Sequence, residues 1–299
     1  MRFLLLVLST PVVFLWACNA SQPQQSDTVA EDGQSLLWRI EGEALEEPSY
    51  LYGTIHLIKE EDFVFGEHLK KTLMEAEKLA LEIPLDEESM MGAAMGLMYK
   101  GDTTLSDFLS PEQMDTLATF FRDTIGLSKM EWMSYQKMKP FALSQVFLTN
   151  MLGEMPMSFE LEFKKIADSL EIPIVGLETI EDQLAVINGL PMKSQIEMVM
   201  TSVRDYQETN EEFGKLIRYY KEQKLDSLHH LMTSEYDDIM EFSESFLDQR
   251  NRNWIPKIEE LVKAQTTFIA VGAGHLLGDQ GVIKLLEAEG YTLTPIETE

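Results

Sequence analysis

The sequence predicts an α/β fold in which a β-sheet core, formed by the N-terminal and C-terminal parts of the chain, is interrupted by a large helical insertion. Short apolar runs of strand-forming residues gather in residues 36–83 and again in residues 267–296. Between them, apolar side chains recur mainly at helical spacing. One α/β domain over residues 35–299 explains this order better than two independent domains do.

The N-terminal part of the domain should supply three strands and one helix. Residues 36–41 and 50–56 are rich in Trp, Leu, Tyr and Ile, and they flank a turn that contains proline, so they predict a β-hairpin. Residues 66–76 carry Leu and Ala at helical spacing. Residues 79–84 form a short apolar run that predicts a third strand and carries Glu82.

The central part should be helical except for one strand. Residues 87–170 predict helices, and the last of these covers residues 158–170 with phenylalanines on one face. Residues 172–177 (IPIVGL) predict a strand, which is followed directly by Glu178. Residues 192–224 carry one apolar stripe and predict a single long helix.

The C-terminal part should return to the sheet. More helix is expected up to about residue 264, and residues 267–271 then predict a strand of Thr, Phe, Ile, Ala and Val. Residues 280–289 predict a helix for which Gly290 is a suitable C-terminal cap. Residues 291–296 predict the last strand, which completes the sheet.

The N-terminus has the features of an exported protein. Residues 1–17 combine a basic start with a short apolar stretch, which predicts a signal peptide. The sequence Leu-Trp-Ala-Cys that ends at Cys18 resembles the lipobox of bacterial lipoproteins, and this resemblance implies lipidation of Cys18. Residues 18–34 then predict a flexible tether. These features predict an extracytoplasmic membrane lipoprotein, with the leaflet left open; the alternative is a chance cysteine near the cleavage site.

The charge of the chain limits its partners. It has 51 Asp and Glu against 24 Lys and Arg, which gives a formal net charge of −27. Such a surface repels phosphate backbones, so nucleic acid is not an expected partner. Because Cys18 is the only cysteine, one chain can form neither a disulfide nor a multi-thiolate metal site.

Two Gly-x-x-His units suggest where the chemistry lies. His56 and His275 each follow an apolar strand pattern, and Glu82 and Glu178 fall at the ends of two further strand patterns. Sites in open α/β sheets lie outside the carboxyl ends of the strands. Two imidazoles and two carboxylates there could bind Zn, Mn or Co and activate water, or they could act without metal as an acid and base pair. The alternative is that each histidine is an ordinary core or loop residue.

The other conspicuous residues have simpler explanations. His68 is expected on a helix surface, and the adjacent His229 and His230 cannot both face one point. The cluster of methionines at positions 90, 91, 95 and 98 is expected to fill the core, with an apolar peptide groove as the alternative. The HExxH, GxSxG, GxGxxG and Walker motifs are absent.

Several longer motifs resemble the TraB/GumN family, whose relatives include the Tiki proteins. The resemblance covers about residues 36–296 and is carried, in this order, by YLYGTIHL, KLALEIP, IVGLETIEDQ, QRNRNWIPKIEEL and FIAVGAGHLLGDQGVIKLLEAEGY. Tiki proteins are metal-dependent proteases with paired GxxH motifs. The resemblance therefore implies a metal-dependent hydrolase for which a divalent metal (Mn, Co or Zn) is the cofactor.

The same resemblance assigns individual residues. His56 and His275 match the histidines of the two GxxH motifs, and Glu82 matches an acid of the family. All three residues are expected as metal ligands. Glu160 matches an acid within a helix and is a fourth expected ligand, although Ser158 replaces the usual glycine there. Glu178 and Arg250 are also expected in the catalytic site; Arg250 could bind a carboxylate or an oxyanion, or it could form a surface ion pair.

The sequence therefore predicts a lipid-anchored hydrolase that acts on a peptide or protein substrate. A lipoprotein that sequesters a peptide or small ligand without turnover is the main alternative, and capture of haem or metal is a third. The oligomeric state stays open.

Overall fold

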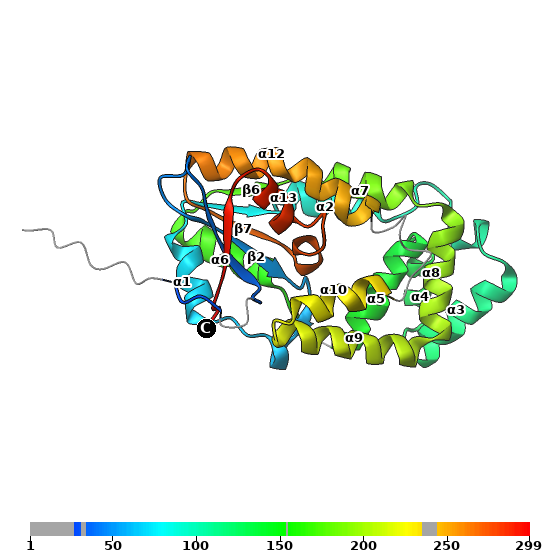
Figure 1. Cartoon of the computed structure of the whole chain (residues 1–299). Coiled ribbons are helices and arrows are strands. Elements are labelled where there is room, and N and C mark those ends of the chain that lie inside the picture. Colours follow the sequence, from blue (N-terminus) through cyan, green and yellow to red (C-terminus); the bar gives the residue numbers. More distant parts are fainter. Residues whose placement is uncertain (1–26, 31–33, 154, 235–243) are drawn as a thin grey trace, which may run out of the picture.

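The computed structural model describes residues 27–30, 34–153, 155–234 and 244–299 (Figure 1). The predictions for the signal peptide, Cys18 and most of the tether lie outside these ranges. The described chain forms an α/β fold around a six-stranded sheet of order β6-β4-β7-β2-β1-β8. These strands are β1 (Leu37–Glu41), β2 (Ser49–Thr54), β4 (Lys78–Leu81), β6 (Ile174–Gly176), β7 (Thr267–Gly272) and β8 (Thr292–Ile296). The predicted fold class is confirmed, because both ends of the chain supply strands and helices lie between them.

Four neighbouring strands of the sheet run in the same direction. β6 pairs parallel with β4, β4 with β7, and β7 with β2. The predicted hairpin is also present, because β1 pairs antiparallel with β2 and places Leu37 opposite Tyr52. β1 pairs antiparallel with β8 as well. As a result, the carboxyl ends of β2, β4, β6 and β7 lie at one edge of the sheet.

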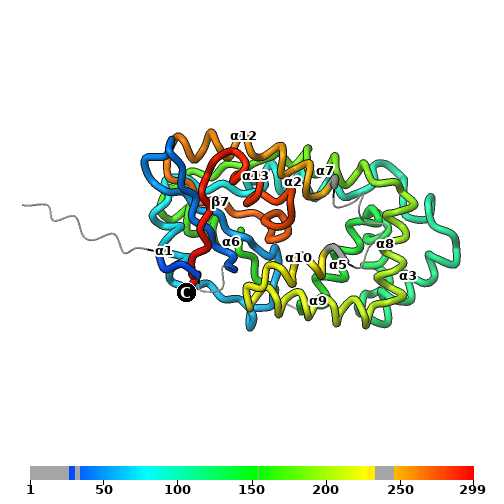
Figure 2. The backbone as a smooth tube through the Cα atoms, viewed as in Figure 1, coloured from blue at the N-terminus to red at the C-terminus, as the bar shows by residue number. Residues whose placement is uncertain are grey.

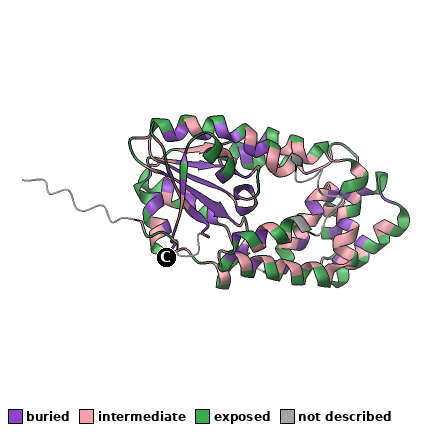
Figure 3. Cartoon of the chain, in the orientation of Figure 1, coloured by how far each residue is buried: buried purple, intermediate pink, exposed green. Residues whose placement is uncertain are grey.

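Both faces of the sheet are covered by helices (Figure 3). Strand residues alternate between the two faces, so Leu79 and Phe268 belong to one buried cluster whereas Ala80 and Ile269 belong to the other. Packed against the first face are α1 (Glu67–Glu75), α6 (Phe159–Leu170), α9 (Tyr206–Lys221) and α10 (Leu225–Ser234). Packed against the second face are α12 (Gln249–Ala264) and α13 (Val282–Ala288).

The helical insertion has an apolar core of its own, and it lies at the far side of the molecule from the sheet (Figure 2). Phe121, Trp132 and Phe147 pack together there, with ring centroids about 5 Å apart. The surrounding helices are α3 (Pro111–Asp123), α4 (Lys129–Tyr135), α5 (Pro140–Leu152) and α8 (Met192–Arg204). Two further helices, α2 (Glu87–Gly96) and α7 (Ile180–Gly189), pack against each other near the sheet (Figure 1).

The single long helix predicted for residues 192–224 is wrong. The helix breaks at Asp205, whose φ of −107° and ψ of 28° leave the helical region, and α8 and α9 lie on either side. Val199 of α8 packs into the core of the insertion, whereas Tyr220 of α9 packs under the sheet. The two halves therefore bury their apolar stripes in different cores, and one straight helix cannot reach both cores. A small sheet made by β3 (Ile58–Lys59) and β5 (Pro156–Met157) was not predicted.

The expectation that the methionines of α2 fill the core is also wrong. Met90, Met91 and Met95 are 51%, 57% and 64% exposed. α2 packs against α7 with its glycines instead, because Gly92 and Gly96 face the side chains of Ile180 and Leu184. The close approach at these glycines turns the methionines outward. Within the described part of the chain, no helix is both long enough and apolar enough to cross a membrane.

Candidate functional site

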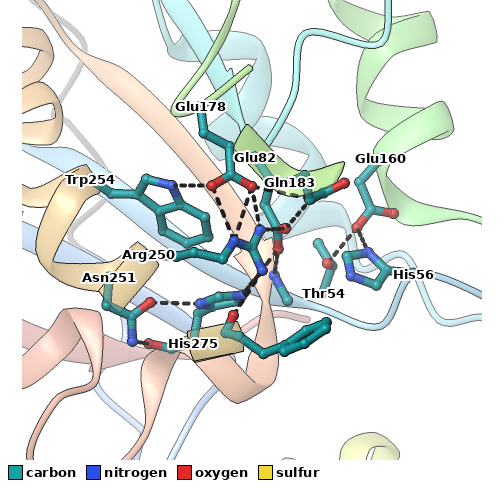
Figure 4. A network of polar contacts seen from close by, with 12 residues as sticks. Thr54, His56, Glu82, Glu160, Glu178, Gln183, Arg250, Asn251, Trp254 and His275 are labelled. Carbon is teal, nitrogen blue, oxygen red and sulfur yellow. Dashed lines mark hydrogen bonds and ion pairs between the residues drawn. The ribbon is translucent and has the colours of Figure 1, made fainter. Parts of the chain in front are cut away.

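Four of the predicted residues meet at the edge where the parallel strands end (Figure 4). His56 lies two residues beyond β2, Glu82 directly follows β4, and Glu178 lies two residues beyond β6. His275 lies in η5 (Ala273–Leu276), a single 3₁₀ turn that follows β7. Four segments that are far apart in the sequence therefore bring two imidazoles and two carboxylates to the same edge.

Gly272 is the point around which three of these side chains gather. A methyl group on its Cα would lie 3.3 Å from Oε1 of Glu82, 3.5 Å from Nε2 of His56 and 3.7 Å from Cδ2 of His275. The N–H of Gly272 also donates a hydrogen bond of 2.8 Å to Oε1 of Glu82. Only glycine leaves the space between these groups open, which explains the first residue of this Gly-x-x-His unit.

The His56 ring is held by a carboxylate on one side and open on the other. Its Nδ1 lies 2.8 Å from Oε1 of Glu160, which also accepts a 2.6 Å hydrogen bond from the Thr54 hydroxyl. The side chain is 67% exposed. Desolvation by the surrounding protein would lower the pKa of His56, but the bond to Glu160 and the charges of Glu160 and Glu82 outweigh it and raise the pKa to about 9.

His275 is buried and neutral. Its Nδ1 lies 2.6 Å from Oδ1 of Asn251, whose amide nitrogen donates to the backbone carbonyls of His275 and Gln280. Oδ1 of Asn251 must therefore accept, so Nδ1 of His275 carries the proton and Nε2 carries the lone pair. Desolvation is the main cause that lowers the pKa of His275 to about 3, and the nearby Arg250 acts in the same direction.

Arg250 connects most of the site. Its guanidinium donates 2.6 Å bonds to both Glu82 and Glu178, and it donates to Nε2 of His275 at 3.1 Å and to the carbonyl of Phe246 at 3.0 Å. Nε also donates to Glu178, so all five N–H groups are in use. The guanidinium also stacks on Trp254 at 4.8 Å from the ring centroid. In this arrangement Arg250 positions protein side chains and has no N–H left for a substrate oxyanion.

The two strand-end carboxylates differ in their surroundings. Burial would raise the pKa of Glu82, but the positive charges of His56 and Arg250, together with the Gly272 N–H, hold it below its usual range. Burial raises the pKa of Glu178, and Arg250 opposes this shift. Gln183 donates to both carboxylates, at 3.3 Å and 3.2 Å. Sequence analysis missed Gln183, although it lies in α7 only five residues after Glu178, within the IVGLETIEDQ motif.

The donor set suits a divalent metal, although it is not arranged as a finished metal site. Within the residues that the structure describes, no group of three or more His, Cys, Asp or Glu side chains is positioned to bind a metal ion. However, Oε1 of Glu82 lies 3.8 Å from Nε2 of His275, and Nε2 of His56 borders the same space above Gly272. Two imidazole nitrogens and one carboxylate oxygen form a ligand set that Zn, Mn or Co accepts.

Glu160 lies behind His56 rather than beside the open space. Its two oxygens accept from Thr54 and Ser158 and contact Nδ1 of His56. A carboxylate in this place orients an imidazole and raises its basicity. His68 lies elsewhere, in α1; it was expected at the surface, but its side chain is only 20% exposed and bonds to Asp27.

Comparison with known proteins identifies the family of this chain. A profile of the TraB/PrgY/gumN family matches residues 36–295. The metalloprotease TIKI1 of Danio rerio is 23% identical over 332 aligned positions, which cover 91% of this chain and 66% of that protein. This chain thus spans slightly less than two thirds of its relative, and no solved structure matches it. Because the family profile covers nearly the whole α/β domain, the chain belongs to the TraB/PrgY/gumN family.

Proposed function

We propose that this protein is a metal-dependent hydrolase that cleaves peptide bonds at the strand-edge site. The observation that carries the proposal is the convergence of His56, Glu82 and His275 around Gly272. Supporting it is the similarity to a relative that bears the name metalloprotease. A divalent metal would be held by Nε2 of His56, Nε2 of His275 and Oε1 of Glu82, where it supplies a Lewis acid that polarises a carbonyl and acidifies water.

The side chains around this set prepare it for that chemistry. Asn251 holds His275 in the tautomer whose Nε2 carries the lone pair. That lone pair accepts from Arg250 in this structure, so a metal would take the place of this hydrogen bond. Glu160 holds Nδ1 of His56, so the exposed Nε2 points toward the space above Gly272. Glu178 and Gln183 hold Arg250 and Glu82 in place. This second layer keeps the reactive atoms within the narrow range of positions that catalysis needs.

We also propose that the protein is lipidated at Cys18 and anchored to a bacterial membrane outside the cytoplasm, where it meets a peptide or protein substrate. The motif at Cys18 and the short apolar leader support this. In cells fed a fatty-acid analogue, the wild type should become labelled and Cys18→Ser should not. A labelled Cys18→Ser protein would contradict the anchor.

The hydrolase is tested with a peptide library and purified protein. Turnover should stop in chelator and return with Zn, Mn or Co, and His56→Ala and His275→Ala should each lower it at least about 100-fold. The double variant should lose little more, because one ligand set acts as a unit. His68→Ala is the control, since His68 bonds to Asp27 and lies outside the site.

Two results would overturn the hydrolase. One is wild-type turnover by folded His56→Ala and His275→Ala, and the other is full turnover by metal-stripped protein. Tight binding of a peptide with no product under any metal would instead establish the sequestering lipoprotein.

A further inference from the structure

A cavity of about 380 Å³ lies between β3 and α9, apart from the strand-edge site. α9 runs along the lower side of the molecule, from the helical insertion back toward the sheet (Figure 1). The floor of the cavity is apolar: Met151 and Ile217 are buried there, and Phe213 is half-buried. Such a floor takes up an apolar side chain and excludes water from it.

The rim of the cavity is cationic, although the chain as a whole carries a charge of −27. Lys59 and Arg218 line it and form no ion pair with any residue that the structure describes. Arg218 rests on the ring of Tyr219, 5.2 Å from its centroid, a contact that uses the face of the guanidinium and leaves its N–H groups available.

The remaining charges at the rim are already matched. Lys221 pairs with Asp62 at 2.5 Å, and Glu222 pairs with Lys224 at 2.6 Å and also interacts with the charge of Arg218. The lining thus has three cations and two carboxylates, and the net positive charge gives the cavity a local preference for an anion. In a strongly acidic protein such a preference is a specific feature of this place and not a property of the whole surface.

The cavity and the strand-edge site share one pair of strands. Lys59 lies three residues after His56, so their Cα atoms are separated by at most about 11 Å. β3 pairs with β5, and Lys59 lies opposite Pro156. β5 ends at Met157, directly before Ser158, which caps α6 and bonds to Glu160. A ligand in the cavity therefore lies next to the segments that carry His56 and Glu160.

We infer that this cavity is a subsite for an apolar residue that bears a free carboxylate, namely the C-terminal residue of a peptide. Lys59 and Arg218 would bind the carboxylate, and Met151, Phe213 and Ile217 would receive the side chain. The inference rests on the proposed peptide hydrolase for the source of the ligand, but binding itself needs no turnover. A fatty acid offers the same chemistry from another source, and the test separates the two.

The test measures binding by calorimetry to the full-length wild type and to His56→Ala, which keeps the cavity. N-acetyl-leucine should bind at least about tenfold more tightly than N-acetyl-leucinamide, since one charge-assisted interaction is worth about 1.4 kcal/mol or more. Lys59→Gln and Arg218→Gln should each weaken the acid and leave the amide unchanged. Arg204→Gln is the matched control, because Arg204 is an exposed arginine on α8 outside the cavity.

Equal binding of the acid and the amide, or unchanged binding by both Lys59→Gln and Arg218→Gln, would overturn the subsite. Octanoate that binds at least tenfold more tightly than N-acetyl-leucine would overturn the peptide as occupant. The two proposals fail separately. Carboxylate-dependent binding without any turnover would contradict the hydrolase and support the subsite. Turnover without a preference for the acid over the amide would support the hydrolase and contradict the subsite.

Discussion

Nδ1 of His56 lies 2.8 Å from Oε1 of Glu160, in a pair formed between the end of a central strand and the first turn of α6. The same carboxylate oxygen accepts the Thr54 hydroxyl, so Glu160 is fixed on the strand as well as on its own helix. The carboxylate stabilises the protonated imidazole and sets the direction of Nε2. The largest contribution that favours protonated His56 therefore comes from a residue that lies 104 positions away in the sequence.

Glu160→Gln should lower the pKa of His56 from about 9 toward its ordinary value in metal-free protein, because the hydrogen-bonded carboxylate charge is lost and only the charge of Glu82 still raises the pKa. The raised pKa stabilises the wild type fully below pH 6.5, and this stabilisation is lost as the pH rises through 9. NMR titration of the imidazole gives the pKa of His56. Urea unfolding at several pH values gives the slope of the free energy of unfolding against pH. Glu162→Gln, two residues further along α6, is the control. A wild-type pKa near 6.5 would contradict the role of Glu160.

His275 should remain neutral in the metal-free folded protein down to a pH of about 3. Below pH 6.5 the unfolded chain binds a proton at this residue and the folded protein does not, so the free energy of unfolding falls by up to about 1.4 kcal/mol per pH unit. Urea unfolding between pH 5 and 6.5 measures this slope above the range in which Glu82 titrates. His275→Asn and His275→Gln should lose the slope, and His68→Gln should keep it. A pH-independent wild type would refute the account.

Arg250→Met should lower the free energy of unfolding by about 3–5 kcal/mol, because Glu82 and Glu178 would be left as unpaired charges in a buried place. Adding Glu178→Gln to this variant should recover part of the loss, since one of the two charges is then removed. Arg252→Met on the same helix should change stability by less than about 0.5 kcal/mol, because its partners among the described residues are the glutamines Gln249 and Gln280. Equal losses for both arginines would show that Arg250 does not hold the site together.

A saturating divalent metal should raise the thermal midpoint of the wild type, because a ligand at 100 times its Kd stabilises the folded state by about 2.7 kcal/mol. Glu82→Gln should lose this increase, since it removes the carboxylate oxygen that faces both histidines. Glu178→Gln should retain most of it, because Glu178 bonds to Arg250, Gln183 and Trp254 and does not border Gly272. Each variant is compared with its own metal-free form. Equal increases in all three proteins would place the metal elsewhere.

The meeting of His56, Glu82, Glu178 and His275 was predictable from the sequence, because parallel strands bring their carboxyl ends to one edge. The role of Arg250 was not. Its side-chain partners lie just beyond β4, just beyond β6 and in η5, and no spacing in the sequence relates these segments. Phe246, whose carbonyl also accepts from Arg250, lies four residues before it in the chain. The two interpretations were binding of a carboxylate or oxyanion and a surface ion pair, and neither places Arg250 in a buried network that uses all five of its N–H groups.

Local patterns also failed where packing decided the outcome. The apolar stripe of residues 192–224 has helical spacing throughout, and only the presence of two separate cores explains the break at Asp205. β3 and β5 are two residues long, which is too short for any periodic pattern, yet they hold the segments next to His56 and Glu160. His68 has the spacing of a helix surface, but Asp27 covers it.

The sheet order also has a consequence for how the protein is made. β7 lies between β4 and β2, although both of those strands are synthesised early and β7 emerges near the end of the chain. Until residues 267–272 arrive, β2 and β4 have no shared neighbour, and each presents an unpaired edge on which another chain could pair. The contacts that close this gap join residues 218 positions apart between β2 and β7 and 189 positions apart between β4 and β7, so they form late and slowly. In a chain that lacks β7, whether truncated or still growing, His56 and His275 cannot come together. The strand-edge site therefore forms only after β7 has joined the sheet.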